Sequence, residues 1–229
     1  MDETANANNF IVAYPQALIP ASGGFQWNVP GYPLYGGEII PPGSANDVVF
    51  LSALPRILER TYCVNPAEVY AAGFSGGARE VSQLGCYAST VFAAVAPVAG
   101  VRRPSPCPAK RAVSVIAFHG SADTTNPYAG NGQKYWTYSV PTAMLYWAKQ
   151  DHCSTKVKTT APLPSLKLFS YTRCKSGAAV RLYEVIGMGH DWPPGPAVPA
   201  SGTSPYGSSS TPFSVDTLIW DFFKAHPMH

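Results

Sequence analysis

The sequence predicts an α/β fold in which a mostly parallel sheet is flanked by helices on both faces. Apolar runs such as 69–73 and 113–118 are short and uninterrupted, as is typical of strands buried on both faces of a sheet. Segments with a helical period separate several of these runs, and this alternation favours parallel strands. The length of 229 residues fits one domain over 1–229, with enough chain to bury a core.

The first half of the chain begins with an apolar run, Phe10–Tyr14, which ends at a proline and is expected to form a strand. Residues 20–45 are rich in Gly, Pro and aromatic residues without a period, so we expect a long loop there. Asn46 or Ser44 can cap a helix that runs to about residue 62, and Pro55 should kink or interrupt it. The elements expected next are a strand over 69–73, a helix over 76–89, and strands over 92–96 and 113–118.

The second half carries two capped helices. Ser139 is expected to cap a helix that has a proline in its first turn and runs on to Cys153. Ser214 is expected to cap the final helix, which has one apolar face. Residues 193–212 are a Pro/Gly/Ser segment and are expected to form a surface loop. Two alternating segments between the helices predict strands, Leu166–Thr172 and Val180–Ile186.

The composition argues against several classes of partner. No apolar run reaches the roughly 18 residues that a membrane span needs, so no membrane partner is expected. No Cys-x-x-Cys or His-Glu-x-x-His spacing occurs, so no metal site is expected. The formal net charge is +3, and no basic helix or interleaved aromatic pattern suggests a nucleic-acid partner. The nearest approach to a basic cluster is interpreted as a solvated loop: Arg102, Arg103, Lys110 and Arg111.

Other features are typical of an extracellular protein. The chain has five cysteines, 23 prolines and 13 tyrosines, and only 13% of its residues are charged. Its first residues, Met1–Thr4, lack the basic start and apolar stretch of a signal peptide. We therefore expect the chain to be a mature or truncated form of a secreted protein.

The motif that carries chemistry is Gly73-Phe74-Ser75-Gly76-Gly77, which matches the G-x-S-x-G nucleophile elbow. A predicted strand ends at Gly73 and a predicted helix begins after Gly76, as the elbow requires. Small neighbours are needed because the turn holds its serine in a strained conformation. Ser75 is the predicted nucleophile, and the N–H of Gly76 is the predicted oxyanion donor. The alternative is a glycine-rich turn with a bystander serine.

A serine nucleophile needs a base and an acid, which follow it along the chain in this fold. Asp123 lies in a loop directly after the predicted strand 113–118 and is the predicted acid. His190 lies in a glycine-containing loop after the strand over 180–186 and is the predicted base. His119 competes as the base, but it stands at a strand end beside the acid and is interpreted as structural. Asp191 competes as the acid and is ranked below Asp123, because it is the sequence neighbour of its own histidine.

With these residues in place, the chain resembles the secreted polyhydroxybutyrate-depolymerase-like esterases, which include feruloyl and acetyl-xylan esterases. The resemblance implies an α/β-hydrolase fold, an ester hydrolase activity without a cofactor, and a triad of Ser75, Asp123 and His190. The segments that carry it are 10–15, 46–50, 62–66, 69–77, 92–100, 119–123, 127–130 and 189–193.

One departure from this family concerns the N-terminal side of the sheet. The family has an upstream strand ending in a His-Gly-type loop that supplies the second oxyanion N–H, and nothing before Phe10 corresponds to it. By this comparison the chain is expected to be N-terminally truncated, with the missing strand belonging between 10–14 and 69–73. Its absence leaves a gap or forces those two strands together. Two hypotheses follow: the sheet closes directly, or a second chain fills the edge in a homo-oligomer.

The resemblance also guides the pairing of the cysteines. Cys153 and Cys174 resemble the family's late disulfide. Cys63 and Cys86 lie on the two helices that flank the nucleophile strand and are expected to pair, which leaves Cys107 without a partner. The alternative is that the cysteines are buried free thiols.

Aromatic residues are the candidate substrate contacts. Trp192 follows His190 directly, and Trp27 resembles an aromatic loop near the family's active site. Phe74, beside the nucleophile, is the third candidate. Aromatic walls suit sugars or hydroxycinnamoyl rings. The alternative for the two tryptophans is ordinary core packing.

The sequence therefore predicts a serine carboxylic ester hydrolase that acts through an acyl-enzyme on a small-molecule or polymer-linked ester. The resemblance favours feruloyl or acetyl groups on plant polysaccharide, with polyhydroxybutyrate as the alternative substrate. A different class of function is a hydrolase-like binding protein that has lost catalysis with the second oxyanion donor. Peptidases of the same fold are a further alternative.

Overall fold

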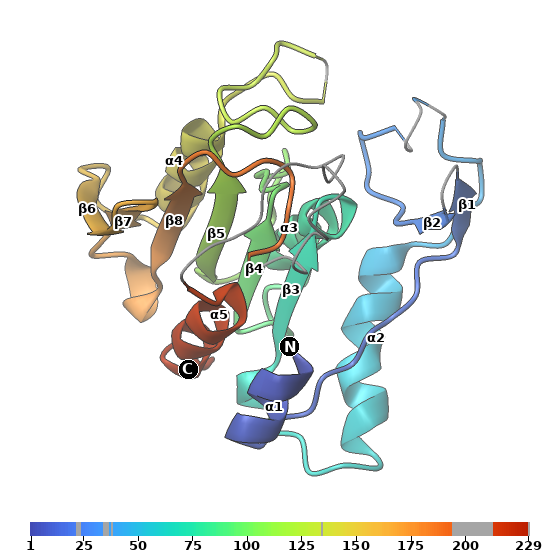
Figure 1. Ribbon diagram of the computed structural model, residues 1–229. Coiled ribbons are helices and arrows are strands. Elements are labelled where there is room, and N and C mark those ends of the chain that lie inside the picture. The colour runs from blue at the N-terminus through green and yellow to red at the C-terminus, as the bar shows by residue number, and fades with distance from the viewer. Residues whose placement is uncertain (22–23, 34–36, 38, 134, 194–212, 229) are drawn as a thin grey trace, which may run out of the picture.

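The computed structural model describes residues 1–21, 24–33, 37, 39–133, 135–193 and 213–228. At its centre is a six-stranded sheet with the order β3-β4-β5-β8-β7-β6 (Figure 1). The first four strands of this order are parallel to one another. β7 pairs antiparallel with β8, and β6 pairs antiparallel with β7. Their bounds are Tyr70–Phe74 (β3), Ala94–Val98 (β4), Ser114–Gly120 (β5), Val180–Val185 (β8), Leu166–Tyr171 (β7) and Lys158–Leu163 (β6). The predicted α/β class with a mostly parallel sheet is confirmed.

Five α-helices are described: α1 (Asp2–Asn8), α2 (Asp47–Glu59), α3 (Gly76–Tyr87), α4 (Val140–Gln150) and α5 (Val215–Lys224). A separate antiparallel ladder joins β1 (Ile19–Ala21) to β2 (Gly24–Gln26), and short 3-10 turns cover Pro66–Glu68 and Lys175–Gly177. In Figure 1, α2 and the β1–β2 ladder stand beside β3, beyond that end of the sheet. Among the described residues no helix is long and apolar enough to cross a membrane.

Alternation along the strands builds a core on each face of the sheet. Val95 and Val115 pack with side chains of α3 and α4, such as Leu84 and Trp147. The residues that alternate with Val95 and Val115 along β4 and β5 point to the opposite face of the sheet, where they pack against α5. The helices therefore cover both faces, as the sequence predicts, because successive side chains of a strand point to opposite faces.

The predicted helix starts agree with the observed caps. The side chains of Asn46, Ser139 and Ser214 each accept a backbone N–H of the first turn of α2, α4 and α5. The expected interruption at Pro55 is wrong, because α2 runs through this buried proline. Most of the loop expected over 193–212 lies outside the described residues.

Several strand predictions need correction. Residues 10–14 form no strand, although their composition favours one, because no neighbouring strand pairs with them. The strand expected over 92–96 lies two residues later, at Ala94–Val98. The sequence pattern did not predict α1, β6 or the β1–β2 ladder, which falls at the start of the loop expected over 20–45. The side chains of β6 are almost all exposed, so it lacks the apolar pattern that identifies a buried strand.

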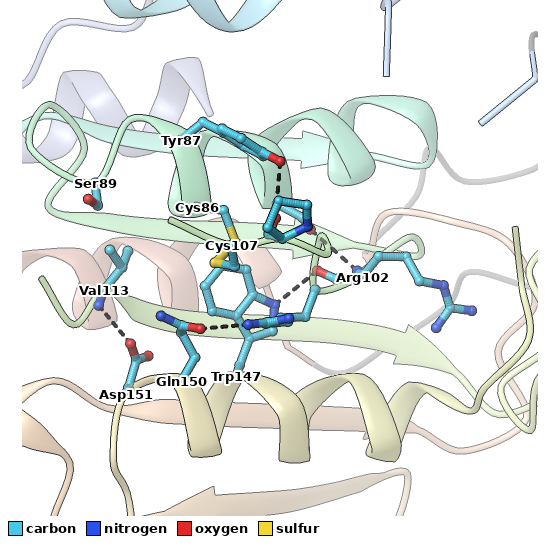
Figure 2. Close-up of a disulfide and its surroundings, with 12 residues drawn as sticks. Cys86, Tyr87, Ser89, Arg102, Cys107, Val113, Trp147, Gln150 and Asp151 are labelled. Atoms are coloured by element: carbon cyan, nitrogen blue, oxygen red, sulfur yellow. Dashed lines mark hydrogen bonds between the residues drawn. A yellow bond between two sulfur atoms is a disulfide. The ribbon is translucent and has the colours of Figure 1, made fainter. Parts of the chain in front are cut away.

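The disulfides confirm one expected pair and correct the other. Cys153 is bonded to Cys174, as the family resemblance implies. Cys86 is bonded to Cys107, with a Cα–Cα distance of 4.8 Å, so the expected pair of Cys63 with Cys86 is wrong (Figure 2). Cys63 is a free, exposed cysteine. Cys63 lies beyond the end of α2 rather than on a flanking helix, whereas Cys86 of α3 faces the segment after β4 that carries Cys107.

A cavity of about 680 Å³ lies along the outer edge of β3. Its walls include residues 9–15, the inner face of α2, residues 69–73 of the β3 segment, and Glu80 of α3. Glu80 is 1% exposed, and neither of its carboxyl oxygens has a hydrogen-bond partner among the described residues. Burial, followed by the charge of Asp47, raises the pKa of Glu80 to about 8. A carboxyl group without a donor in an apolar wall is neutral at low pH and costly to ionise.

The raised pKa of Glu80 predicts a pH-dependent stability. Between the ordinary pKa of 4.5 and about 8, the folded protein binds a proton that the unfolded chain has released. The contribution of Glu80 to the free energy of unfolding therefore falls as pH rises through this window, by at most about 1.4 kcal/mol per pH unit.

We expect the Glu80→Gln variant to lose this slope. Urea denaturation of both proteins from pH 5 to pH 8 should show the wild type losing stability relative to the variant as pH rises. Burial also raises the pKa of Asp151, to about 7, but its effect is common to both proteins and cancels in the difference. A difference that stays constant over this range would mean that Glu80 ionises normally.

Candidate active site

Ser75 occupies the turn between β3 and α3. Its φ of 53° and ψ of −111° place a non-glycine residue in a strained backbone conformation. The N–H of Ser75 donates to the carbonyl oxygen of Val98 at the end of β4, at 2.9 Å. A Cβ atom at Gly73 would collide with the backbone of Gly77, and one at Gly100 would collide with the carbonyl of Ser75. Glycine is therefore required on both sides of this turn.

His190 and Asp123 meet Ser75 from two other loops. His190 follows β8, and its Nε2 lies 2.9 Å from Oγ of Ser75. Its Nδ1 lies 2.8 Å from Oδ2 of Asp123, which follows β5. His190 and Asp123 are each 4% exposed. The three predicted site residues thus form one hydrogen-bonded series, although 115 residues separate Ser75 from His190.

The carboxylate of Asp123 is held by four donors. The backbone N–H groups of Thr125 and Asn126 donate to Oδ1 at 2.9 and 2.7 Å. At Oδ2, His119 joins His190, with its Nε2 at 3.2 Å. Burial raises the pKa of Asp123. The hydrogen bonds from the two histidines and their charges together lower it by more, so the pKa lies well below the usual range. The carboxylate is therefore ionised at neutral pH.

His119 is closer to the site chemistry than its predicted structural role implied. It is the penultimate residue of β5 and has no exposed surface, and its Nε2 lies 2.8 Å from the carbonyl oxygen of Asn126 as well as close to Asp123. A proton on Nε2 donates to both acceptors, so His119 fixes the carboxylate that orients His190. Its position four residues before Asp123 was the available sequence signal.

Asn126 and Arg79 were not identified from the sequence. The side-chain amide of Asn126 donates to the carbonyl oxygen of Ala99 at 2.7 Å and accepts from Arg79 at 2.5 Å. Arg79 lies in the first turns of α3, directly after the nucleophile. These contacts tie the loop that carries Asp123 to the turn at Ser75, and the pattern of residue types gives no sign of them.

The predicted oxyanion donor stands at the start of α3. Gly76 is the first residue of this helix, so its N–H has no acceptor within the helix and is available to an oxyanion beside Ser75. On the other side of β3, no strand is paired with it in the described part of the chain. The geometry therefore provides one main-chain donor at a position suited to the oxyanion.

The three aromatic candidates differ in their surroundings. Phe74 is 36% exposed and its ring lies 4.9 Å from that of His190. Trp192 lines the cavity beside β3, and its Nε1 donates to Asp216 of α5 at 2.8 Å. Trp27 lines the same cavity and packs against the core. Phe74 is therefore the candidate that lies directly at the reacting groups.

Asp191 does not reach the ring of His190 in the described contacts. Its Oδ1 accepts the backbone N–H of Trp192 at 2.8 Å, which makes it a local turn residue. Among the described residues, no group of three or more His, Cys, Asp or Glu side chains is arranged to hold a metal ion.

The comparison with known proteins agrees with this chemistry. No protein-family model matches the chain. Over 157 residues, 64% of the chain, it is 29% identical to feruloyl esterase B of Piromyces equi. Over 191 residues, 81% of the chain, it is 22% identical to a bifunctional acetylxylan esterase/xylanase of Neocallimastix patriciarum. The chain is a relative of feruloyl and acetylxylan esterases.

The match spans only part of each curated protein, 29% of the first and 25% of the second. Among solved structures, the acetyl xylan esterase from Aspergillus awamori superimposes with a TM-score of 0.46 at 14% identity, over 63% of this chain and 62% of that chain.

The hydrogen bonds to Asp123 predict graded effects on hydrolysis of p-nitrophenyl acetate. Asp123→Asn should lower kcat by about 10⁴-fold, because the amide favours the wrong tautomer of His190. His119→Leu should lower kcat/KM by about ten- to a hundredfold, since a hydrogen bond to a charged group contributes about 1.5–3 kcal/mol.

His119→Gln is the matched control, because its amide keeps an N–H donor and should recover part of the loss. Circular dichroism establishes that each variant is folded. A folded Asp123→Asn variant with the wild-type rate would contradict the assignment of Asp123 as the acid.

Proposed function

We propose that the chain, acting as one unit over residues 1–229, is a serine carboxylic ester hydrolase with Ser75 as nucleophile, His190 as base and Asp123 as acid. The observation that carries the proposal is the hydrogen-bonded series from Ser75 through His190 to Asp123, at 2.9 and 2.8 Å, on a G-x-S-x-G turn.

The reaction follows from this geometry. Nε2 of His190 takes the proton of Ser75 Oγ as the oxygen attacks the ester carbonyl carbon, and the N–H of Gly76 donates to the oxyanion that forms. His190 then returns the proton to the leaving alcohol, which departs and leaves an acyl-enzyme on Ser75. Water, deprotonated by His190, releases the acid and restores the serine. Asp123 stays ionised throughout and stabilises the imidazolium.

For the substrate we propose feruloyl or acetyl esters on plant polysaccharide. The support is the similarity to a feruloyl esterase and to an acetylxylan esterase. Phe74, exposed beside His190, offers an aromatic surface to a hydroxycinnamoyl ring or a sugar. We further propose that the protein is secreted, since two disulfides in one chain persist in oxidising compartments.

A second candidate function is a hydrolase-like binding protein without appreciable turnover. It is favoured by the single main-chain donor identified at the oxyanion position, because a missing second donor costs about 10²–10³ in rate. Such a protein would bind esters at the same cleft and release no acid.

The test compares wild type with Ser75→Ala on methyl ferulate, acetylated xylan, polyhydroxybutyrate and a peptide substrate. We expect the wild type to release ferulate or acetate, and the variant to be slower by about 10⁴-fold or more. Equal background rates on all four substrates would overturn the hydrolase proposal and favour the binding protein. Preferred cleavage of polyhydroxybutyrate or of the peptide would replace the proposed substrate class.

A further inference from the structure

Arg102, which follows β4, is buried, although the sequence pattern predicts a solvated loop there. It is 1% exposed. Its N–H donates to Oγ of Ser82 at 3.4 Å, and its carbonyl oxygen accepts the Nε1–H of Trp147 at 2.9 Å, so its backbone is held on two sides. The side chain extends away from Trp147 (Figure 2). Arg102 therefore carries a guanidinium group into the interior of the protein.

The guanidinium group of Arg102 lacks a hydrogen-bond partner. Its Nε, Nη1 and Nη2 are all buried, and none of them reaches an acceptor in the part of the chain that the structure describes. The ion pairs found there do not include Arg102. Burial lowers the pKa of Arg102 to about 10, so the group stays protonated at neutral pH. A buried cation without an acceptor or a counter-charge is costly, because it has lost its hydration.

A second arginine faces the same aromatic ring. Cζ of Arg102 lies 3.0 Å from the ring centroid of Trp136, and Cζ of Arg79 lies 5.6 Å from it. The ring of Tyr138 lies 4.6 Å from Cζ of Arg102, and the ring of Tyr32 lies 5.4 Å from Cζ of Arg79. Aromatic faces attract cations and offset part of the cost of burial. Two like charges on one ring repel each other, however, and the charge of Arg79 helps to lower the pKa of Arg102.

The groups around these arginines supply hydroxyls but no free negative charge. Burial raises the pKa of Tyr32 to about 12, so its hydroxyl stays protonated although the charges of both arginines reach it. The hydroxyl of Tyr138 bonds to backbone groups. The charge of Asp123 reaches Arg79, but four donors already hold that carboxylate. Nε of Arg79 is buried and, within the described ranges, also lacks an acceptor.

We propose that one small monovalent anion of the chloride class binds at the guanidinium group of Arg102, with Arg79 and the hydroxyl of Tyr32 beside it. The anion accepts the N–H groups that no protein atom accepts, and its charge offsets two cations on one ring. Arg102 and Trp136 are each 1% exposed, so a sugar or a hydroxycinnamoyl group does not reach the guanidinium. Weakly hydrated chloride and bromide are favoured over fluoride, because they lose less hydration free energy on burial.

The test is urea denaturation in sodium bromide, chloride, fluoride or gluconate at equal ionic strength. At about 100 mM, we expect bromide and chloride to lower the unfolding equilibrium constant at least about fivefold relative to gluconate, with saturation, because the anion binds only the folded protein. Fluoride should change it by less than about twofold. Ordinary salt effects run the other way, since strongly hydrated anions stabilise proteins by being excluded from their surface.

Arg102→Met locates the site, because methionine keeps an apolar chain against Trp136 and removes the charge. We expect this variant to lose the halide dependence and, in gluconate, to be at least as stable as the wild type. Arg103→Met is the matched control, since it removes the neighbouring arginine, which bonds to Gln150, and should respond to halides as the wild type does. Ser75→Ala should also respond as the wild type does, so the result is independent of the proposed hydrolase activity.

Chloride-35 NMR measures the binding directly. The wild type should broaden the chloride line at least about twice as much as Arg102→Met does, and bromide should reverse the excess by competition. If Arg102→Met does not fold, Arg102→Lys takes its place. It should bind chloride at least about threefold more weakly than the wild type, because an ammonium group lacks the planar fork of donors.

Three outcomes would overturn the proposal. The first is a stability that does not differ among the four salts. The second is a stability that follows the ordinary salt order, with fluoride above bromide, which would make the effect one of the general surface. The third is an equal response to halides in the wild type and in the folded variant at Arg102, which would place the anion elsewhere.

Discussion

The turn at Ser75 is the constraint on which the rest of the site depends. A serine at φ 53° directs its side chain away from the sheet only if neighbouring backbone segments approach one another very closely. Gly73 and Gly100 allow this close approach because they have no Cβ atom, and the hydrogen bond from Ser75 to Val98 fixes the turn to β4. Because β4 and β5 are parallel neighbours in the same sheet, the loop after β5 that carries Asp123 emerges at the same end of the sheet as the turn at Ser75. The loop after β8 then places His190 against both residues.

The sequence was sufficient to predict that Ser75, Asp123 and His190 lie together, because each follows a strand and the carboxyl ends of parallel strands meet at one end of the sheet. It was not sufficient for His119, Asn126 and Arg79, whose roles depend on contacts between loops that have no repeating pattern. The pairing of Cys86 with Cys107 was missed for a related reason. Cys63 was expected on a helix beside the nucleophile strand, but it lies beyond the end of α2, and a disulfide requires two cysteines whose side chains face each other.

Whether a segment forms a strand depends on whether a neighbouring strand pairs with it, as the two edges of the sheet illustrate. Phe10–Tyr14 has a strand-like composition and forms no strand, because no described strand lies beside it. Lys158–Leu163 lacks the apolar pattern of a buried strand and forms β6, because β7 pairs with it antiparallel despite a register shift after Thr160. Direct closure of the sheet between 10–14 and 69–73, one of the two hypotheses, is wrong, because residues 10–14 do not pair with β3 and a cavity is lined by both segments. The unpartnered carboxyl of Glu80 lies in the wall of that cavity.

The most direct measurement of the central claim is the site at which a fluorophosphonate reacts. Such a reagent phosphonylates a serine only when a neighbouring base activates it. Peptide mass spectrometry after brief treatment should find one modification, on Ser75, and none in Ser75→Ala or in protein denatured beforehand. A folded wild-type protein that remains unmodified, or that is modified on another residue, would contradict the account of Ser75 as an activated nucleophile.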